Sequence, residues 1–120
     1  MGVEIEIVGN KDFLEIILRG TFDRPSLEGF VDGLKDAQEK YDATRIFVDA
    51  TRVSGEIVEL DRFWIGKYAS EVLSRRVKFA FLVEDERIDK FFENVAVNRG
   101  LSVIVVGNRR AALDWLLKED

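Results

Sequence analysis

The sequence predicts an α/β sandwich with three layers, in which four helices cover both faces of a five-stranded mixed sheet that is mostly parallel. Two observations carry this prediction. After an opening pair of strand patterns, helical and strand periodicities alternate along the chain, as parallel strands with helical crossovers require. The later strand patterns are almost wholly apolar, which is typical of strands covered on both faces. At a length of 120 residues, we expect residues 1–120 to form one domain.

The first two strand patterns predict an antiparallel hairpin. Residues 3–7 alternate apolar side chains with Glu4 and Glu6, and an apolar run follows at residues 13–18. The connection between them is too short for a parallel crossover. The alternating glutamates indicate a strand with one face in water, at an edge of the sheet.

Asp23 and Ser26 predict the start of the first helix, because either side chain can accept hydrogen bonds from free backbone amides. Pro25 is tolerated in a first helical turn. Apolar side chains then recur at helical spacing and predict one buried stripe, formed by Leu27, Phe30, Val31, Leu34 and Ala37.

The middle of the chain predicts an interior strand and a second helix. An apolar run at residues 45–50 has Asp49 near its expected carboxyl end, and we expect residues 51–55 to form a loop. The second helix is expected to begin near Asp61. Its apolar side chains are too many for one stripe: Phe63, Trp64, Ile65, Tyr68, Ala69, Val72 and Leu73.

The last third of the chain predicts a strand at residues 77–83, a helix, a strand at residues 102–106 and a final helix. Three acids at residues 84–86 are expected at the N-terminus of the third helix, where the helix dipole favours negative charge. Gly100 predicts a left-handed stop after that helix. Asn108 is the expected N-cap of the final helix.

The composition excludes several kinds of chemistry. The chain has no cysteine and no histidine, which excludes disulfides, thiolate nucleophiles, zinc–thiolate clusters, histidine bases and histidine metal ligands. An enzyme built from this sequence would depend on carboxylates, lysine, tyrosine or a borrowed cofactor. We expect a protein that is not an enzyme and that needs no metal ion or cofactor.

Charge and hydropathy narrow the partners. The formal net charge of −5, from 23 acidic and 18 basic side chains, repels nucleic-acid phosphates. No segment is apolar over the roughly eighteen residues of a membrane span, and the N-terminus lacks the pattern of a signal peptide. We expect a cytoplasmic protein that has no membrane span and binds no nucleic acid.

The first candidate site comprises Asp49, Thr51, Ser54 and Gly55. A carboxylate at the carboxyl end of a strand could hold Mg²⁺ or accept a phosphoryl group, as in response-regulator receivers, but their companion acids and lysine are missing here. The alternative for Asp49 is to organise a turn. Ser54 on an exposed loop is accessible to a kinase, and a phosphate would add roughly two negative charges beside a helix entry. The alternative for Ser54 is an ordinary turn.

A second candidate site lies at the start of the last helix. The free amides after Asn108, together with Arg109 and Arg110, could bind a phosphate or carboxylate. The alternative is that the two arginines extend along neighbouring surface or pair with acids.

The aromatic residues of the second and third helices form a third candidate. Phe63, Trp64 and Tyr68 cannot all be hidden by one side of a short helix, because successive residues diverge by about 100°. Together with Phe92 they pack in the core or under loops, form a self-association surface, or line a ligand site.

Five stretches of the chain share a pattern with one known group of proteins: residues 47–55, 60–63, 66–68, 93–100 and 112–116. The most distinctive are Asn-Arg-Gly at 98–100 and Ala-Leu-Asp-Trp-Leu at 112–116. On these residues the chain resembles the SpoIIAA-like proteins of the STAS (sulfate transporter and anti-sigma factor antagonist) and SEC14-type group. The resemblance implies a SpoIIAA/STAS-like sandwich whose strands follow one another in order. It also implies a non-enzymatic regulatory module that acts through protein–protein contacts.

The resemblance also bears on the site and the partners. In anti-sigma factor antagonists the loop after the third strand reads Asp-Ser-Ser-Gly, and a partner kinase phosphorylates a serine there. The same place reads Arg-Val-Ser-Gly here, so Ser54 is the implied switch although the aspartate is absent. The implied partner is another protein or a second copy of the chain. SEC14-type relatives hold lipids between helices and sheet, so the alternative function is a carrier or sensor of a small apolar or acidic ligand.

Overall fold

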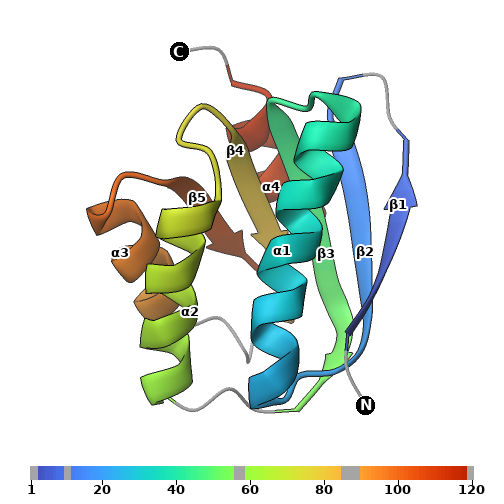
Figure 1. Ribbon diagram of the computed structural model, residues 1–120. Helices are drawn as coiled ribbons and strands as arrows, with labels where there is room; N and C mark the ends of the chain where they lie inside the picture. The colour runs from blue at the N-terminus through green and yellow to red at the C-terminus, as the bar shows by residue number, and fades with distance from the viewer. Residues whose placement is uncertain (1–2, 10–11, 56–58, 85–89, 119–120) are drawn as a thin grey trace.

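The computed structural model describes residues 3–9, 12–55, 59–84 and 90–118. Within these residues the chain forms five strands and four helices (Figure 1). The strands are β1 (Val3–Val8), β2 (Leu14–Thr21), β3 (Arg45–Ser54), β4 (Lys78–Leu82) and β5 (Ser102–Val106). The helices are α1 (Arg24–Tyr41), α2 (Glu59–Val72), α3 (Lys90–Asn98) and α4 (Arg109–Leu116).

The strands form one sheet in the order β1-β2-β3-β4-β5, so neighbours in the chain are neighbours in the sheet. β1 and β2 are antiparallel, and the other three pairs are parallel. The predicted mixed sheet with an N-terminal hairpin is therefore confirmed. Glu4 and Glu6 are exposed on the edge strand β1, as their alternation predicted.

The helices lie in two layers on either side of the sheet. α1, α2 and α3 pack on one face, and α4 packs on the other face against β3, β4 and β5 (Figure 1). The central strands are covered on both faces: Ile46 and Val48 belong to the larger core, whereas Phe47 belongs to the core beneath α4. No helix in the described part of the chain is long and apolar enough to cross a membrane.

Three predicted helix ends are confirmed. The Asp23 carboxylate accepts a hydrogen bond of 2.9 Å from the N–H of Ser26, and the Ser26 hydroxyl accepts one of 3.0 Å from the N–H of Asp23. The Asn108 side chain accepts a hydrogen bond of 2.7 Å from the N–H of Ala111. Gly100 has a φ of +99° just beyond the end of α3. These ends depend on short-range contacts, which local sequence specifies.

The predicted loop at residues 51–55 is wrong for most of its length, because β3 continues to Ser54. β2 continues to Thr21 and offers a parallel partner that the prediction did not include. Asp49 therefore lies inside β3 and not at its carboxyl end.

The second helix lies where it was predicted, and its described part starts at Glu59, close to the expected start near Asp61. The described part of α3 starts at Lys90, and Glu84, one of the three acids expected at the N-terminus of this helix, is not helical. The other two acids expected to start α3, at residues 85–86, fall outside the described residues.

Candidate functional site

Ser54 is the last residue of β3 and is exposed. The register between β2 and β3 shifts after Ile17, and beyond the shift Thr21 lies opposite Ser54. The two side-chain oxygens are 3.0 Å apart, and the Ser54 hydroxyl also donates to the carbonyl of Gly20 at 3.3 Å. The serine is thus held by β2 while its side chain remains accessible.

The backbone around Ser54 is fixed by its contact with Phe22. The N–H of Phe22 donates a hydrogen bond of 3.0 Å to the carbonyl of Ser54. Gly55 follows with a φ of +94°, and a Cβ on it would lie 2.9 Å from the carbonyl oxygen of Phe22. Both the positive φ and this close approach require glycine at position 55.

Two arginines share the sheet face of Ser54, and the sequence prediction missed them. Val53 is buried in the core, so Arg52 and Ser54 project together from the opposite face. Arg19 lies opposite Arg52 in the register and pairs with Glu6 at 3.2 Å. The strand alternation of residues 52–54 is the only sequence signal for this arrangement.

Asp49 and Thr51 form a local unit within β3. One carboxylate oxygen of Asp49 accepts hydrogen bonds from the N–H of Thr51 at 2.9 Å and from its hydroxyl at 2.6 Å. The carboxylate therefore organises the backbone where the register of β3 shifts. Among the residues that the structure describes, no group of three acidic side chains is placed to hold a metal ion.

Arg109 reaches from the start of α4 across the sheet to β2. Its guanidinium donates to both carboxylate oxygens of Glu15, at 2.8 and 3.2 Å, and lies 4.8 Å from the centre of the Phe47 ring. The hydrogen bond to Glu15 is the main cause that raises the pKa of Arg109; burial opposes it, and the charges of Glu15 and Asp49 add to it.

The rest of the predicted anion site is dispersed. The side chain of Asn108 caps α4, and the Arg110 side chain is 91% exposed, with its guanidinium 4.0 Å from the Asp114 carboxylate. The guanidinium of Arg109 forms an ion pair with the Glu15 carboxylate. The structure therefore does not bring Asn108, Arg109 and Arg110 together around one point.

The predicted aromatic group divides between two environments. The rings of Trp64 and Tyr68 are stacked, with centres 5.3 Å apart and an interplanar angle of 4°. The Tyr68 hydroxyl donates a hydrogen bond of 2.7 Å to Asp32 on α1. That bond is the main cause that raises the pKa of Tyr68 to about 12. Phe63 is 40% exposed, with the guanidinium of Arg99 5.8 Å from its ring centre.

Phe92 lines an apolar cavity between the sheet and the helices α1, α2 and α3. The cavity has a volume of about 130 Å³, and its walls include Phe22, Phe30, Phe81 and Arg62. Phe92 and Phe81 lie with ring centres 5.6 Å apart. Of the four predicted aromatic residues, Phe92 is the one that faces this cavity.

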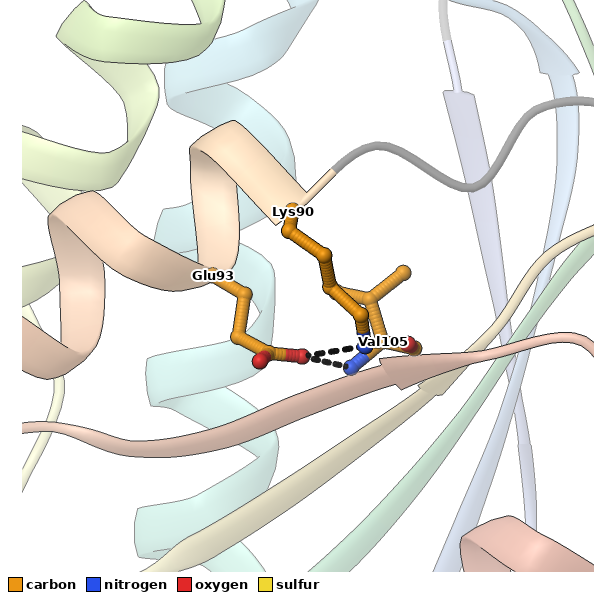
Figure 2. Close-up of polar contacts among 3 residues, drawn as sticks. All are labelled: Lys90, Glu93 and Val105. Atoms are coloured by element: carbon orange, nitrogen blue, oxygen red, sulfur yellow. Dashed lines mark hydrogen bonds and ion pairs between the residues drawn. The ribbon is translucent and has the colours of Figure 1, made fainter.

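A contact that the sequence did not reveal covers part of the free edge of β5. Figure 2 shows Lys90 and Glu93 of α3 reaching the backbone of Val105. One oxygen of Glu93 accepts from the N–H of Val105 at 2.7 Å and from Lys90 at 3.0 Å, and Lys90 donates to the carbonyl of Val105 at 2.6 Å. Free N–H and C=O groups of an edge strand invite pairing with another chain. We call this contact the β5 latch.

No protein-family model matches the sequence, and no curated protein matches it either. Solved structures do resemble the fold. An anti-sigma factor antagonist from Mycobacterium paratuberculosis has a TM-score of 0.63 at 12% identity, over 97% of this chain and 95% of that chain. An uncharacterised protein of the DUF3478 family from Shewanella loihica PV-4, described as having a SpoIIAA-like fold, has a TM-score of 0.56 at 19% identity, over 96% and 94%.

A third similar structure is a serine-to-glutamate variant of RsbS from Moorella thermoacetica. Its TM-score is 0.53 at 16% identity, over 93% of each chain. Each of these structures covers nearly the whole of this chain, and the low identities make the likeness one of fold. The resemblance to SpoIIAA-like proteins is therefore confirmed at the level of architecture, and the chain has the SpoIIAA-like fold.

Proposed function

We propose that this protein is a non-enzymatic regulatory module that acts by binding a protein partner through the surface around Ser54. The observation that carries the proposal is the exposed Ser54 hydroxyl, held at the end of β3 in a SpoIIAA-like fold. The fold likeness to an anti-sigma factor antagonist over 97% of the chain supports it. We further propose that the chain works as one domain in the cytoplasm. The chain has no cysteine and therefore needs no disulfide, which fits a reducing compartment.

Exposed apolar side chains near Ser54 in the chain support a protein-binding surface. Leu60 and Phe63, in the first turns of α2, are 68% and 40% exposed. Apolar side chains beside polar groups are typical of protein interfaces. The partner is another protein or a second copy of this chain.

The charges around Ser54 support phosphorylation as the switch. A phosphate carries roughly two negative charges at neutral pH, and arginine is its preferred ionic partner. Arg52 and Arg19 lie on the same sheet face as Ser54. A phosphate on Ser54 would also replace the hydroxyl contacts with Thr21 and Gly20. Phosphorylation therefore changes both the charge and the shape of this surface.

The test compares partner binding by the wild type, Ser54→Ala and Ser54→Asp after purification from the cells that make the protein. We expect the partner to copurify with the wild type and with Ser54→Ala. With Ser54→Asp, the amount of copurified partner should fall about tenfold or more. Ser70→Asp is the matched control, because Ser70 lies near the C-terminal end of α2 and bonds only locally to Lys67. If the partner is a second copy, light scattering will give the dimer mass for the wild type and the monomer mass for Ser54→Asp.

Mass spectrometry of the same samples tests the switch. We expect phosphate on Ser54 in part of the native protein. The proposal would be contradicted by a wild-type chain that carries no phosphate, copurifies with no partner, stays monomeric and does not differ in behaviour from Ser54→Asp.

A second candidate function is the carriage or sensing of a small apolar or acidic ligand. The cavity of about 130 Å³ behind Phe92 favours it, because ligand sites are typically concave and mostly apolar. Native mass spectrometry with a library of lipids and metabolites tests this function. A retained ligand supports it, and a chain that stays empty throughout counts against it.

A further inference from the structure

We infer that a phosphate on Ser54 is held by two arginines of its own chain, Arg52 and Arg19. To bind it, Arg19 gives up its ion pair with Glu6 on the edge strand β1. We call Arg19 and Arg52 the arginine clamp. This inference rests on the phosphorylation of Ser54 proposed above, and adds the groups that hold the phosphate and the structural change that follows.

Four polar side chains gather where β2 and β3 end side by side (Figure 1). On β2 they are Arg19 and Thr21, and on β3 they are the register partners of these two, Arg52 and Ser54. The two members from each strand are separated by one residue, so they share a face of the sheet. Diagonal neighbours on a sheet face are within reach of long side chains. Both arginines can therefore reach a phosphate on Ser54.

The arginine clamp is unfavourable for the sheet itself. Like charges directly opposite one another destabilise paired strands, and Arg19 and Arg52 are direct neighbours across β2 and β3. Within the part of the chain that the structure describes, the exposed side chain of Arg52 forms no hydrogen bond or ion pair. An anion bound between the two guanidinium groups would replace their repulsion by attraction.

A phosphoserine supplies that anion. Its phosphate carries roughly two negative charges and three acceptor oxygens, and guanidinium groups bind phosphate through paired N–H donors. The transfer forms a bond between the Ser54 Oγ and the γ-phosphorus of a nucleoside triphosphate. It breaks the bond from that phosphorus to the bridging oxygen, and releases the nucleoside diphosphate and the hydroxyl proton. The partner kinase of the proposed function supplies the triphosphate.

The ion pair between Arg19 and Glu6 is weak enough to exchange. The guanidinium nitrogen and the carboxylate oxygen are 3.2 Å apart, and the two side chains are 46% and 53% exposed. Exposed ion pairs contribute little to stability. A phosphate with two charges attracts a guanidinium more strongly than a carboxylate with one charge at the same distance. Phosphorylation of Ser54 should therefore leave Glu6 as a free carboxylate on β1.

Other carboxylates lie near this end of the sheet. Asp23 caps the N-terminus of α1, and Asp49 accepts hydrogen bonds from the N–H and hydroxyl of Thr51. Glu4 is exposed and lies opposite Arg19 in the register of β1 and β2. Glu4 therefore has the same charge and strand as Glu6, whereas the ion pair of Arg19 is with Glu6. This difference makes Glu4 a matched control.

The test is a phosphorus NMR titration of the full chain with phosphoserine incorporated at position 54 during synthesis. A phosphoserine in water loses its second proton near pH 6. The arginine clamp should lower the titration midpoint to about pH 5, because nearby cations favour the dianion. This shift corresponds to a tenfold loss of proton affinity.

Arg52→Gln and Arg19→Gln should each move the midpoint about halfway back toward pH 6. Arg76→Gln is the matched control, because it removes the same charge from an exposed side chain. Arg76 precedes β4, at the end of the parallel strands opposite to Ser54. At that separation salt screens its charge, so the midpoint should stay within about 0.1 of the wild-type value.

Glu6→Gln tests the exchange at Arg19. It removes the carboxylate that competes with the phosphate, so the midpoint should fall by about a further 0.3–0.5. Glu4→Gln removes the same charge from the same strand and leaves the ion pair in place, so it should lower the midpoint less.

Free phosphate could bring the same chemistry to the arginine clamp. The unmodified chain should bind inorganic phosphate with a dissociation constant above about 1 mM, because a free ion lacks the covalent link that holds a phosphoserine at the site. Saturation below about 1 mM, with loss of binding in Arg52→Gln, would overturn the assignment to phosphoserine and indicate a site for a free anion.

The remaining outcomes bear on separate parts of the inference. A wild-type midpoint near pH 6, or equal effects of Arg52→Gln and Arg76→Gln, would overturn the arginine clamp. Equal effects of Glu6→Gln and Glu4→Gln would overturn the exchange. The phosphoserine is incorporated without a kinase or a partner, so these results are independent of whether the native protein is phosphorylated. A native protein without phosphate would contradict the proposed switch and leave the result of the titration unchanged.

Discussion

Gly66 of α2 lies so close to Val95 of α3 that a Cβ at position 66 would come within 2.9 Å of a methyl carbon of Val95 and 3.0 Å of its Cβ. It would also lie 3.4 Å from the carbonyl oxygen of Phe92. Glycine inside a helix costs about 0.5–1 kcal/mol relative to alanine. The tight contact between α2 and α3 explains why the helix contains one here.

Gly66→Ala should therefore lower the free energy of unfolding by about 1–3 kcal/mol, because overpacking outweighs the gain in helix propensity. Gly29→Ala in α1 is the matched control. A Cβ there meets nothing within 4 Å, so this change should raise stability by about 0.5–1 kcal/mol. Urea unfolding followed by circular dichroism measures both. Equal stabilisation by the two changes would show that α2 and α3 are not in tight contact.

The elements of the fold were predictable where the signals are local. Alternating glutamates placed β1 at an edge, and Asp23 and Asn108 marked the starts of α1 and α4. Each of these signals acts within a few residues. The extension of β3 to Ser54 was not predictable, because it depends on the distant tail of β2 as a pairing partner.

The side-chain contacts of the site were the least predictable part. Arg109 meets Glu15 from 94 positions away, and Glu93 meets Val105 across the gap between a helix and an edge strand. Charge and spacing in the sequence do not identify such distant contact partners. The aromatic surplus of α2 indicated only that some rings lie outside the core, and the structure identifies Phe63 as the exposed one.

Removal of the β5 latch should weaken the edge of the sheet. Glu93→Ala leaves the N–H of Val105 without its acceptor and should lower the free energy of unfolding by about 1–2 kcal/mol. Glu93→Gln keeps an acceptor oxygen and should cost less than Glu93→Ala. Hydrogen exchange at the Val105 amide should accelerate about tenfold in the alanine variant.

The control for this change is Glu39→Ala, which removes an exposed glutamate from α1. It should leave both the stability and the exchange of Val105 near their original values. An unchanged exchange rate at Val105 in Glu93→Ala would contradict a role for the latch in protecting the edge.

The Arg109–Glu15 pair should stabilise the attachment of α4 to the sheet. Its two hydrogen bonds and the Phe47 ring favour it, while the 49% exposure of the arginine side chain limits its strength. Arg109→Gln should lower the free energy of unfolding by about 1 kcal/mol. Arg110→Gln, on a side chain that is 91% exposed, should change it by less than about 0.3 kcal/mol.

A double-mutant cycle with Glu15→Gln isolates the pair. The coupling energy should be about 0.5–1 kcal/mol and should fall in high salt. A coupling energy of zero, or an equal loss of stability from Arg109→Gln and Arg110→Gln, would contradict the assignment.

The Tyr68–Asp32 hydrogen bond predicts a loss of stability in alkali. The bond to Asp32 raises the pKa of Tyr68 from 10.0 to about 12 in the folded chain. A pKa raised by folding contributes stability that is fully present below the unfolded pKa and is lost as the pH rises through the folded one. The bond should therefore stabilise the protein fully below pH 10, and its contribution should disappear between about pH 10 and 12.

Near-ultraviolet absorbance of tyrosinate measures this directly in Tyr41→Phe, which leaves Tyr68 as the only tyrosine. The titration midpoint should lie near 12, and Asp32→Asn should move it toward 10. Glu28→Gln is the control, because Glu28 acts on Tyr68 only through a weaker charge effect and should move the midpoint less. A titration midpoint near 10 that does not change in Asp32→Asn would mean that α1 and α2 are not joined by this bond in solution.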